Sequence, residues 1–470
     1  MTATRSLWFA LACAAFTLSL AVRAQAQSLN YVAAFDGTNG EEPSNVMQAT
    51  DGNLYGVTAG GSLGPAEQGN VFRITPSGEL TTVYNFCSRP HCLDGARPLT
   101  APILGSDGNL YGVTSAGGSD LNNAGGWGTV YKLTLDGQLT TLYTFCTVSP
   151  CLDGQDPVGI IQAADGNFYG ATFSAGQFNA GTLFKMTPAG EFSVVHNFCT
   201  LADCADGQWP GFAPIQGSDG NLYGTTGYGG KADAGILYDL TPSGSFNVVH
   251  TFLCYLTTCN RGGDPIAVVQ DPAGNLFGTT EFGGINDDGT IFEITVNHQY
   301  LNLYTFSEPQ PSALALANDG NFYGITGGIN GEGAVYQFTP SGTFNTLYNF
   351  TSPGSVPRSA LFQAPNGSLY GSVGLYDGQW NGAIYSLSNN LSPFVQPVPF
   401  MGKVGKQIII LGNGLTGSTS VTFNGVAAEF TVESDTYIKA TVPAGATTGA
   451  VSVVTPSGVL NSNPQFVVTK

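Results

Sequence analysis

Along most of this chain, apolar and polar residues alternate in short runs, and the same group of four runs recurs. The phrase "DGNLYGVT" at residues 51–58 returns in related form at 107, 165, 219, 273, 319 and 366. The turn glycines of the seven copies are Gly52, Gly108, Gly166, Gly220, Gly274, Gly320 and Gly367. Repetition at this spacing predicts one supersecondary unit used many times.

Each copy has the same layout. A proline opens the first run, as in "PVGIIQA" (157–163), and an Asp-Gly-Asn turn leads to the second, as in "NLYGVT" (109–114). A Gly-rich loop precedes the third run, as in "GTVYKLT" (128–134), and a tight turn precedes the fourth, as in "LTTLYTF" (139–145). Period-two alternation between such turns predicts four antiparallel strands, so the sequence indicates an all-β, seven-bladed β-propeller.

The two ends of the repeat region suggest how the ring closes. The seventh copy has no fourth run after residues 382–388, whereas "LNYVAAF" (29–35) has the character of one. We therefore expect the N-terminal strand to complete the last blade and remove its open edge. A ring open at that seam, or two smaller sheets, is the alternative.

A glycine lies inside the second run of every copy. Because glycine weakens a strand, these residues predict close approach of a ring or backbone from the adjoining blade, which is a packing role. The glycines are Gly56, Gly112, Gly170, Gly224, Gly278, Gly324 and Gly371.

After Asn390 the repeats stop, and short alternating runs predict a small β-sandwich. Residues 391–470 resemble the IPT/TIG immunoglobulin-like domain in "GNG" (412–414), "VTFNG" (421–425), "VPAGATTG" (442–449) and "VTPSG" (454–458). This resemblance implies a spacer or binding module.

From about residue 43 to 388 the repeats resemble the GloVer-type tandem repeats of exported bacterial proteins, through "DGNLYG" and "GTVYKLTLDG". That resemblance implies an exported protein and assigns no catalytic residue.

The N-terminus has the pattern of a secretory signal peptide. Arg5 precedes the apolar stretch 6–22, and "AQA" (24–26) fits a cleavage site. We therefore predict a signal peptide over 1–26, a propeller over 27–390 and the immunoglobulin-like domain over 391–470. An uncleaved anchor is the alternative. No later segment is apolar enough to cross a bilayer, so the mature chain is expected to be secreted, periplasmic or on the cell surface.

Charge limits the choice of partner. The formal net charge is −18, which argues against nucleic acid and anionic lipid as binding partners.

The Asp-Gly-Asn and Pro-Ser-Gly turns share one rim of the predicted ring and leave little room for a site, whereas every long loop lies on the other rim. The mature chain's three tryptophans, Trp127, Trp209 and Trp380, fall on that loop-rich rim. They are the candidate ligand-binding residues, as stacking platforms for a glycan or anchors for a protein. Packing beneath neighbouring loops is the alternative.

Catalytic and metal motifs are weak in this chain. "GGSLG" (60–64) lacks the strand-to-helix turn that a nucleophilic serine needs, and the histidines His91, His196, His250 and His298 lack zinc-site spacing. The aspartates of recurring "DG" pairs, Asp36, Asp94, Asp153 and Asp206, are expected to cap turns, with calcium as the alternative. No catalytic residue and no cofactor is predicted, although a carboxylate pair for glycoside hydrolysis stays open.

Eight of the cysteines form four pairs with identical spacing, each after the fourth run of a repeat. The pairs are Cys87/Cys92, Cys146/Cys151, Cys199/Cys204 and Cys254/Cys259. In an exported protein this repetition favours four local disulfides that staple loops, over zinc or redox sites.

Together these features predict a monomeric, non-enzymatic binding or adhesion protein that recognises an extracellular glycan or protein through its loop-rich rim. An extracellular carbohydrate-active enzyme, either lyase or hydrolase, is the first alternative. A structural component of the cell surface is the second.

Overall fold

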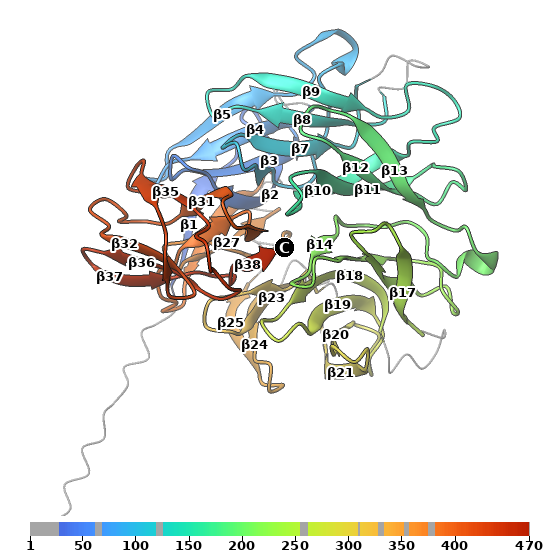
Figure 1. Ribbon diagram of the computed structural model, residues 1–470. Helices are drawn as coiled ribbons and strands as arrows, with labels where there is room; N and C mark the ends of the chain where they lie inside the picture. The colour runs from blue at the N-terminus through green and yellow to red at the C-terminus, as the bar shows by residue number, and fades with distance from the viewer. Residues whose placement is uncertain are drawn as a thin grey trace, which may run out of the picture.

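The chain folds into a ring of β-sheets with a smaller β-sandwich beside it (Figure 1). The computed structural model describes residues 28–61, 68–118, 126–253, 262–308, 311–327, 333–351, 357–374 and 381–469. Seven four-stranded sheets, which we call blades 1 to 7, use residues up to Ser388. Among these described residues, single turns of 3-10 helix, η2 (Pro90–Cys92) and η4 (Ala202–Cys204), lie between blades.

The four strands of a blade follow one another from the centre of the ring outward. Blade 1 contains β2 (Glu41–Gln48), β3 (Leu54–Gly60), β4 (Asn70–Ile74) and β5 (Leu80–Asn85). Blade 2 contains β6 (Ile103–Leu104), β7 (Leu110–Thr114), β8 (Thr129–Leu133) and β9 (Leu139–Thr144). Blade 3 contains β10 (Gln155–Gln162), β11 (Phe168–Ser174), β12 (Thr182–Met186) and β13 (Phe192–Asn197). Blade 4 contains β14 (Ile215–Gln216), β15 (Leu222–Thr226), β16 (Ile236–Leu240) and β17 (Phe246–Thr251).

The remaining blades have the same order. Blade 5 contains β18 (Gly263–Gln270), β19 (Leu276–Phe282), β20 (Thr290–Ile294) and β21 (Tyr300–Thr305). Blade 6 contains β22 (Ala315–Leu316), β23 (Phe322–Gly327), β24 (Gly333–Phe338) and β25 (Phe344–Phe350). Blade 7 contains β26 (Phe362–Gln363), β27 (Leu369–Val373), β28 (Ala383–Ser388) and, at its outer edge, β1 (Ser28–Ala34).

The first strand of the chain belongs to the last blade. β1 pairs antiparallel with β28, with Ser28 opposite Ser388. One hydrophobic cluster contains Ile384 of blade 7 and Val46 of blade 1, just as another joins Tyr223 of blade 4 to Val268 of blade 5. The predicted all-β propeller class is therefore confirmed, and blade 7 packs on blade 1.

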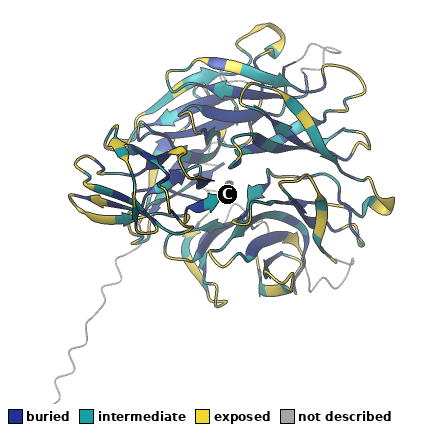
Figure 2. Cartoon of the chain, viewed as in Figure 1, coloured by how far each residue is buried: buried dark blue, intermediate teal, exposed yellow. Residues whose placement is uncertain are grey.

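Burial follows the alternation of the sequence (Figure 2). Every residue of β15 and β16 is buried, whereas the outer strand β17 has no buried residue. The middle strands of a blade are covered by adjacent blades on both faces, so the residues on both faces are mostly apolar or small. The outer strands keep one polar face.

The recurring glycine of the second strand faces an aromatic ring of its own blade. Gly224 lies directly opposite Tyr238 on the adjacent strand β16, and a Cβ on Gly224 would overlap the Tyr238 ring. The other pairs are Gly56–Phe72, Gly112–Tyr131, Gly170–Phe184, Gly278–Phe292, Gly324–Tyr336 and Gly371–Tyr385. The predicted packing role holds, but the expectation that the group comes from the adjoining blade is wrong. The ring crosses from the neighbouring strand because only a missing side chain leaves room for it.

One face of the ring, which we call the turn face, carries the tight turns. In blade 4, Tyr223 Oη donates to Asp219 Oδ2 at 2.7 Å and Asn221 N donates to Asp219 Oδ1 at 3.0 Å. The same tyrosine-to-aspartate bond joins Tyr55 to Asp51, Tyr111 to Asp107, Tyr169 to Asp165 and Tyr323 to Asp319. Burial opposes ionisation of Asp107, but hydrogen bonds from Lys132, Asn109 and Tyr111 outweigh it and hold its pKa at about 2.

Glutamines at the ends of the innermost strands join neighbouring blades on the turn face. Gln270 Oε1 accepts a hydrogen bond from Ser218 N of blade 4 at 2.6 Å, and Gln270 Nε2 donates to Gly274 O at 3.2 Å. Equivalent bonds from the preceding blade run from Ser106 N to Gln162, from Ala164 N to Gln216 and from Asn318 N to Gln363. We call these four glutamines the glutamine belt.

The C-terminal sandwich contains two four-stranded sheets and one strand pair. The first sheet has the order β29 (Gln396–Val398), β31 (Gln407–Leu411), β35 (Tyr437–Thr441) and β34 (Phe430–Val432). The second has the order β33 (Val426–Ala427), β32 (Ser420–Phe423), β36 (Val451–Thr455) and β37 (Gly458–Asn461). β30 (Met401–Lys403) pairs parallel with β38 (Val467–Thr469).

The sandwich rests on the turn face. Ile409 and Leu411 of β31 share a hydrophobic cluster with Ala49 of blade 1 and Leu110 of blade 2. Thr436 Oγ1 donates to Thr50 O at 2.6 Å. Phe394 N donates to Pro365 O of blade 7 at 3.0 Å. Asn318 Nδ2 of blade 6 donates to Ser392 O at 2.6 Å. The immunoglobulin-like domain is therefore attached to blades 6, 7, 1 and 2, and its apolar contacts are with blades 1 and 2.

Candidate binding surface on the loop-rich rim

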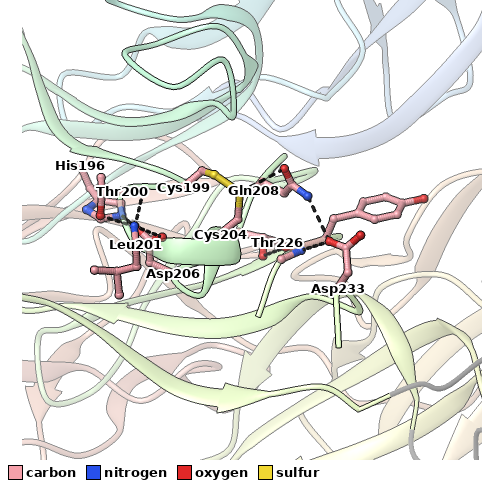
Figure 3. Close-up of a disulfide and its surroundings, with 11 residues drawn as sticks. His196, Cys199, Thr200, Leu201, Cys204, Asp206, Gln208, Thr226 and Asp233 are labelled. Carbon is pink, nitrogen blue, oxygen red and sulfur yellow. Dashed lines mark hydrogen bonds and ion pairs between the residues drawn. A yellow bond between two sulfur atoms is a disulfide. The ribbon is translucent and has the colours of Figure 1, made fainter. Parts of the chain in front are cut away.

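The opposite face of the ring, which we call the loop face, carries the stapled loops. In Figure 3, the Cys199–Cys204 disulfide closes the loop between blades 3 and 4, and Asp206 lies inside it. Asp206 is 2% exposed and accepts bonds from Thr200 N at 3.0 Å, Thr200 Oγ1 at 2.6 Å and Leu201 N at 3.1 Å. A buried carboxylate thus satisfies the backbone of the loop that the disulfide closes.

His196 of β13 lies against the same carboxylate. Its Nε2 is 3.4 Å from Asp206 Oδ2, and its ring stacks on Phe246 with centroids 3.7 Å apart. Burial lowers the pKa of His196, although the Asp206 carboxylate opposes that shift. The imidazole therefore acts as a packed ring of the repeat.

The stapled loops of blades 1 and 2 have the same design. Disulfides join Cys87 to Cys92 and Cys146 to Cys151. Asp94 accepts from Tyr84 Oη at 2.7 Å and Ser88 N at 2.9 Å, and Asp153 accepts from Tyr143 Oη at 2.8 Å and Cys146 N at 2.9 Å. Cys254 and Cys259 lie outside the described residues. Three of the predicted local disulfides are therefore present.

Asp36 caps its own turn, accepting from Thr38 N at 2.9 Å and Asn39 N at 3.1 Å. The four "DG" aspartates therefore all cap backbone N–H groups. Among the residues that the structure describes, no group of three or more His, Cys, Asp or Glu side chains is placed to hold a metal ion.

The residue before the proline that opens a blade has an unusual backbone. Its φ lies between 50° and 58° in all five repeats where it is described: Glu42, Arg97, Asp156, Trp209 and Asp264. Its N–H donates to the preceding blade, as from Trp209 N to Ala180 O at 2.8 Å and from Asp264 N to Ala234 O at 2.9 Å. Left-handed backbone costs free energy in a non-glycine residue, and the inter-blade bond offsets that cost. The backbone is therefore fixed at this position while the side chain differs in each blade.

Trp209 is the centre of an aromatic platform, which we define as Phe173, Trp209 and Tyr228. Its ring lies 6.2 Å from Phe173 at an interplanar angle of 24°, and 5.2 Å from Tyr228 at 70°. Phe173 lies near the end of strand β11 of blade 3 and is 43% exposed, whereas Tyr228 follows β15 of blade 4 and is 40% exposed. Two blades thus bring three rings together at their junction, with Trp209 half-buried between the exposed Phe173 and Tyr228.

Polar groups flank the platform. Gln208 Nε2 donates to Asp233 Oδ1 at 3.1 Å, and Gly229 N donates to the same oxygen at 2.9 Å (Figure 3). Asp264 of blade 5 lies beside Gly227, so closely that a Cβ on Gly227 would contact its carboxylate. Burial, and then the nearby Glu281 carboxylate, raise the pKa of Asp264 to about 6. The surroundings therefore offer one amide and two carboxyl groups.

The other predicted tryptophans lie elsewhere. Trp127 is half-buried between blades 2 and 3, where its carbonyl accepts from Asp156 N at 3.1 Å. Trp380 lies outside the described residues. Phe173 and Tyr228 were not predicted from the sequence, although each is an aromatic residue where the loop after a second strand begins, in "ATFS" (171–174) and "TTGYGG" (225–230).

In the parts of the chain that the structure covers, no helix has the length and hydropathy to span a membrane.

Comparison with known proteins identifies the family of this chain and the type of its C-terminal domain. No curated protein matches the chain. A structure of a Bacteroides thetaiotaomicron protein of unknown function is 12% identical over 77% of this chain and 76% of its own, with a TM-score of 0.44. The periplasmic gluconolactonase of Pseudomonas aeruginosa is 17% identical over 67% of this chain and 90% of its own, with a TM-score of 0.43. A Xanthomonas campestris gluconolactonase is 12% identical over 60% of this chain and 91% of its own, with a TM-score of 0.36. Because these TM-scores lie below 0.5, none of the three carries an argument about activity.

The family models agree with the resemblances in the sequence. The IPT/TIG domain model matches residues 395–468, which contain the sandwich. The Gloeobacter/Verrucomicrobia repeat model matches residues 14–211 and 199–385, which together span the propeller. The chain therefore belongs to the Gloeobacter/Verrucomicrobia repeat family and carries a C-terminal IPT/TIG domain.

Proposed function

We propose that this protein is an exported, non-enzymatic binding module that recognises an uncharged glycan through its loop face. The observation that carries this proposal is the aromatic platform, in which Phe173, Trp209 and Tyr228 meet at the junction of two blades. Phe173 and Tyr228 stay exposed beside the half-buried Trp209, and exposed aromatic rings on a rigid scaffold are typical of recognition sites.

The platform and its surroundings complement a sugar ring. The apolar C–H face of a pyranose packs on an aromatic ring, while its hydroxyls need hydrogen-bond partners at the edge. Gln208, Asp233 and Asp264 supply such partners. Carboxylates at the site and a formal net charge of −18 disfavour an acidic glycan, so the proposal is limited to uncharged ones.

Export is part of the proposal. The predicted signal peptide over 1–26 gives the route, and the three disulfides fit an oxidising compartment. We expect the mature chain to act as a monomer.

The test is binding to an array of neutral polysaccharides by the purified mature chain. Trp209→Ala should weaken binding at least about tenfold, as expected for loss of a central aromatic anchor. Phe282→Ala is the matched control, because Phe282 has the same place in blade 5 as Tyr228 in blade 4 and is 42% exposed. The control should bind as the wild type does.

Equal binding by Trp209→Ala and the wild type would contradict the platform as the site. Release of sugar products, abolished by Asp264→Asn, would instead favour a carbohydrate-active enzyme. Binding to a protein but to no glycan would favour a protein partner.

A further inference from the structure

We infer that the space between the C-terminal sandwich and the turn face is a second binding site, for a small, uncharged and mainly apolar molecule. This site is on the opposite face of the ring from the aromatic platform, and its ligand belongs to a different chemical class.

A half-open cavity of about 670 Å³ lies between the two domains. Its floor is formed by the innermost strands of four consecutive blades, each giving one aliphatic residue: Ile161, Ile215, Val269 and Leu316. Its roof includes the apolar Phe400 and Val467 of the sandwich and the uncharged polar residues Thr448, Ser462, Asn463 and Gln465. Figure 1 shows β38, which begins at Val467, near the centre of the ring and across from β14. Ligand sites are commonly clefts of about 300–1,000 Å³ between domains, so the size fits a small molecule.

The way the sandwich docks explains the cavity. Ile409 and Leu411 fix it on blades 1 and 2, and Phe394 fixes it on blade 7. It contacts blade 6 where Asn463 Nδ2 donates to Leu316 O at 3.5 Å, and it stands over blades 3 to 5 without filling the space above them. The expectation that the turn face leaves little room for a site is wrong here, because a second domain forms the missing wall.

The lining determines the charge of the ligand. Of the described residues that line the cavity, Asp271 is the only one with an ionisable side chain. Its carboxylate already accepts from Asn275 N at 2.8 Å and Asn275 Nδ2 at 3.1 Å. An anionic ligand would lose its hydration and meet only a carboxylate, which is costly in an apolar space. A cation would have to share the Asp271 carboxylate with the Asn275 N–H groups that already bind it.

The glutamine belt supplies the polar contacts. Gln216 and Gln270 each use the side-chain carbonyl oxygen to join two blades and one amide N–H to bond their own turn. A primary amide has two N–H donors, so each of these residues retains one. The complementary ligand has an apolar body and one or two hydrogen-bond acceptors. The floor is aliphatic, so it lacks the stacking rings that favour a sugar.

Two related dyes test the inference with the full mature chain. N-phenyl-1-naphthylamine is uncharged, and 8-anilino-1-naphthalenesulfonate adds a sulfonate to the same ring system. The wild type should bind the neutral dye, seen as a rise in fluorescence, at least about tenfold more tightly than the anion. Ile215→Trp, which fills the floor, should weaken the neutral dye at least about tenfold, and Ile215→Val should retain it.

A second variant keeps the test decisive if Ile215→Trp fails to fold. Ser218 is exposed at the cavity wall, so Ser218→Arg should fold normally and should bring the anionic dye to an affinity near that of the neutral one. The inference is wrong if the wild type does not bind the neutral dye, or if a folded Ile215→Trp or Ser218→Arg binds both dyes as the wild type does. Trp209→Ala should leave dye binding unchanged, so this inference and the proposed glycan site can fail separately.

Discussion

The two faces of the ring use the repeat in opposite ways. On the turn face, most blades present the same residues, and these residues bind one another, as in the tyrosine-to-aspartate bond of five blades and in the glutamine belt. On the loop face, the residue before the proline keeps its backbone but changes from Glu42 to Arg97, Asp156, Trp209 and Asp264. Identity between repeats thus marks contacts that hold the blades together. Difference between repeats marks positions that are free to select a ligand.

The largest expected effect comes from a position that all blades share. Gly224→Ala places a methyl group into the ring of Tyr238, and both residues are buried, so the blade must shift. The free energy of unfolding should fall by about 3 kcal/mol, measured by urea denaturation. Gly211 is the control near the loop face, since a Cβ there meets nothing within 4 Å. If Gly211→Ala proves equally destabilising, the steric explanation fails.

The next effect depends on pH and concerns a position that differs between blades. The pKa of Asp264 is raised from 3.8 in the unfolded chain to about 6 in the folded protein. Between these two pH values the folded protein keeps the Asp264 proton, whereas the unfolded chain has lost it. The cost of ionising Asp264 is absent below pH 3.8 and complete above pH 6. Asp264→Asn should therefore be more stable than the wild type by about 2 kcal/mol at pH 8, and no more stable at about pH 4. An equal difference at both pH values in thermal unfolding would show that ionisation is not the cause.

A smaller effect compares one glutamine from each face. Gln270→Leu removes the 2.6 Å bond from Ser218 N between blades 4 and 5 and should cost about 1 kcal/mol of stability. Gln208→Leu removes a 3.1 Å bond to Asp233 on the loop face and should cost less than about half as much, because that bond is exposed. The reverse order in denaturation experiments would mean that the loop face holds the blades together more strongly than the turn face.

The smallest effect tests a difference within the shared interior. Tyr238, Tyr131, Tyr336 and Tyr385 have buried hydroxyls without a hydrogen-bond partner among the described residues, whereas Phe72, Phe184 and Phe292 have the same place in the other blades. Tyr238→Phe should change stability by less than about 1 kcal/mol, in the stabilising direction. A loss larger than that in thermal unfolding would reveal a partner for the hydroxyl.

The fold could be predicted because its information is repeated. One copy of "DGNLYGVT" is only a turn, but seven copies with the same four runs leave few architectures. The place of β1 could be predicted because the seventh repeat has no fourth run, while the run at residues 29–35 belongs to no other repeat. The partner of Gly224 was not predictable, since a missing side chain does not say from which side a ring approaches.

The sites could be predicted less well. Trp209 could be assigned to the loop face from the order of the strands, but its contact with Phe173 joins two blades and depends on how they pack. The docking of the sandwich has a signal in "QIIIL" (407–411), where the apolar residues do not alternate. Ile408 and Ile410 enter the sandwich core, while Ile409 and Leu411 contact the propeller. A strand that is apolar on both faces thus marks a sheet covered on both sides.

The pairing of β1 with β28 also governs how the protein is made. Ser28 is synthesised early, and Ser388 follows only after all the blades between them. The ring therefore closes late, by a contact between distant parts of the chain, which is slow compared with local hairpins. Until then blade 7 is incomplete and β1 is an unpaired strand that a second copy could capture. A circular permutant that joins β1 directly after β28 should refold faster and aggregate less, which stopped-flow refolding and light scattering would measure.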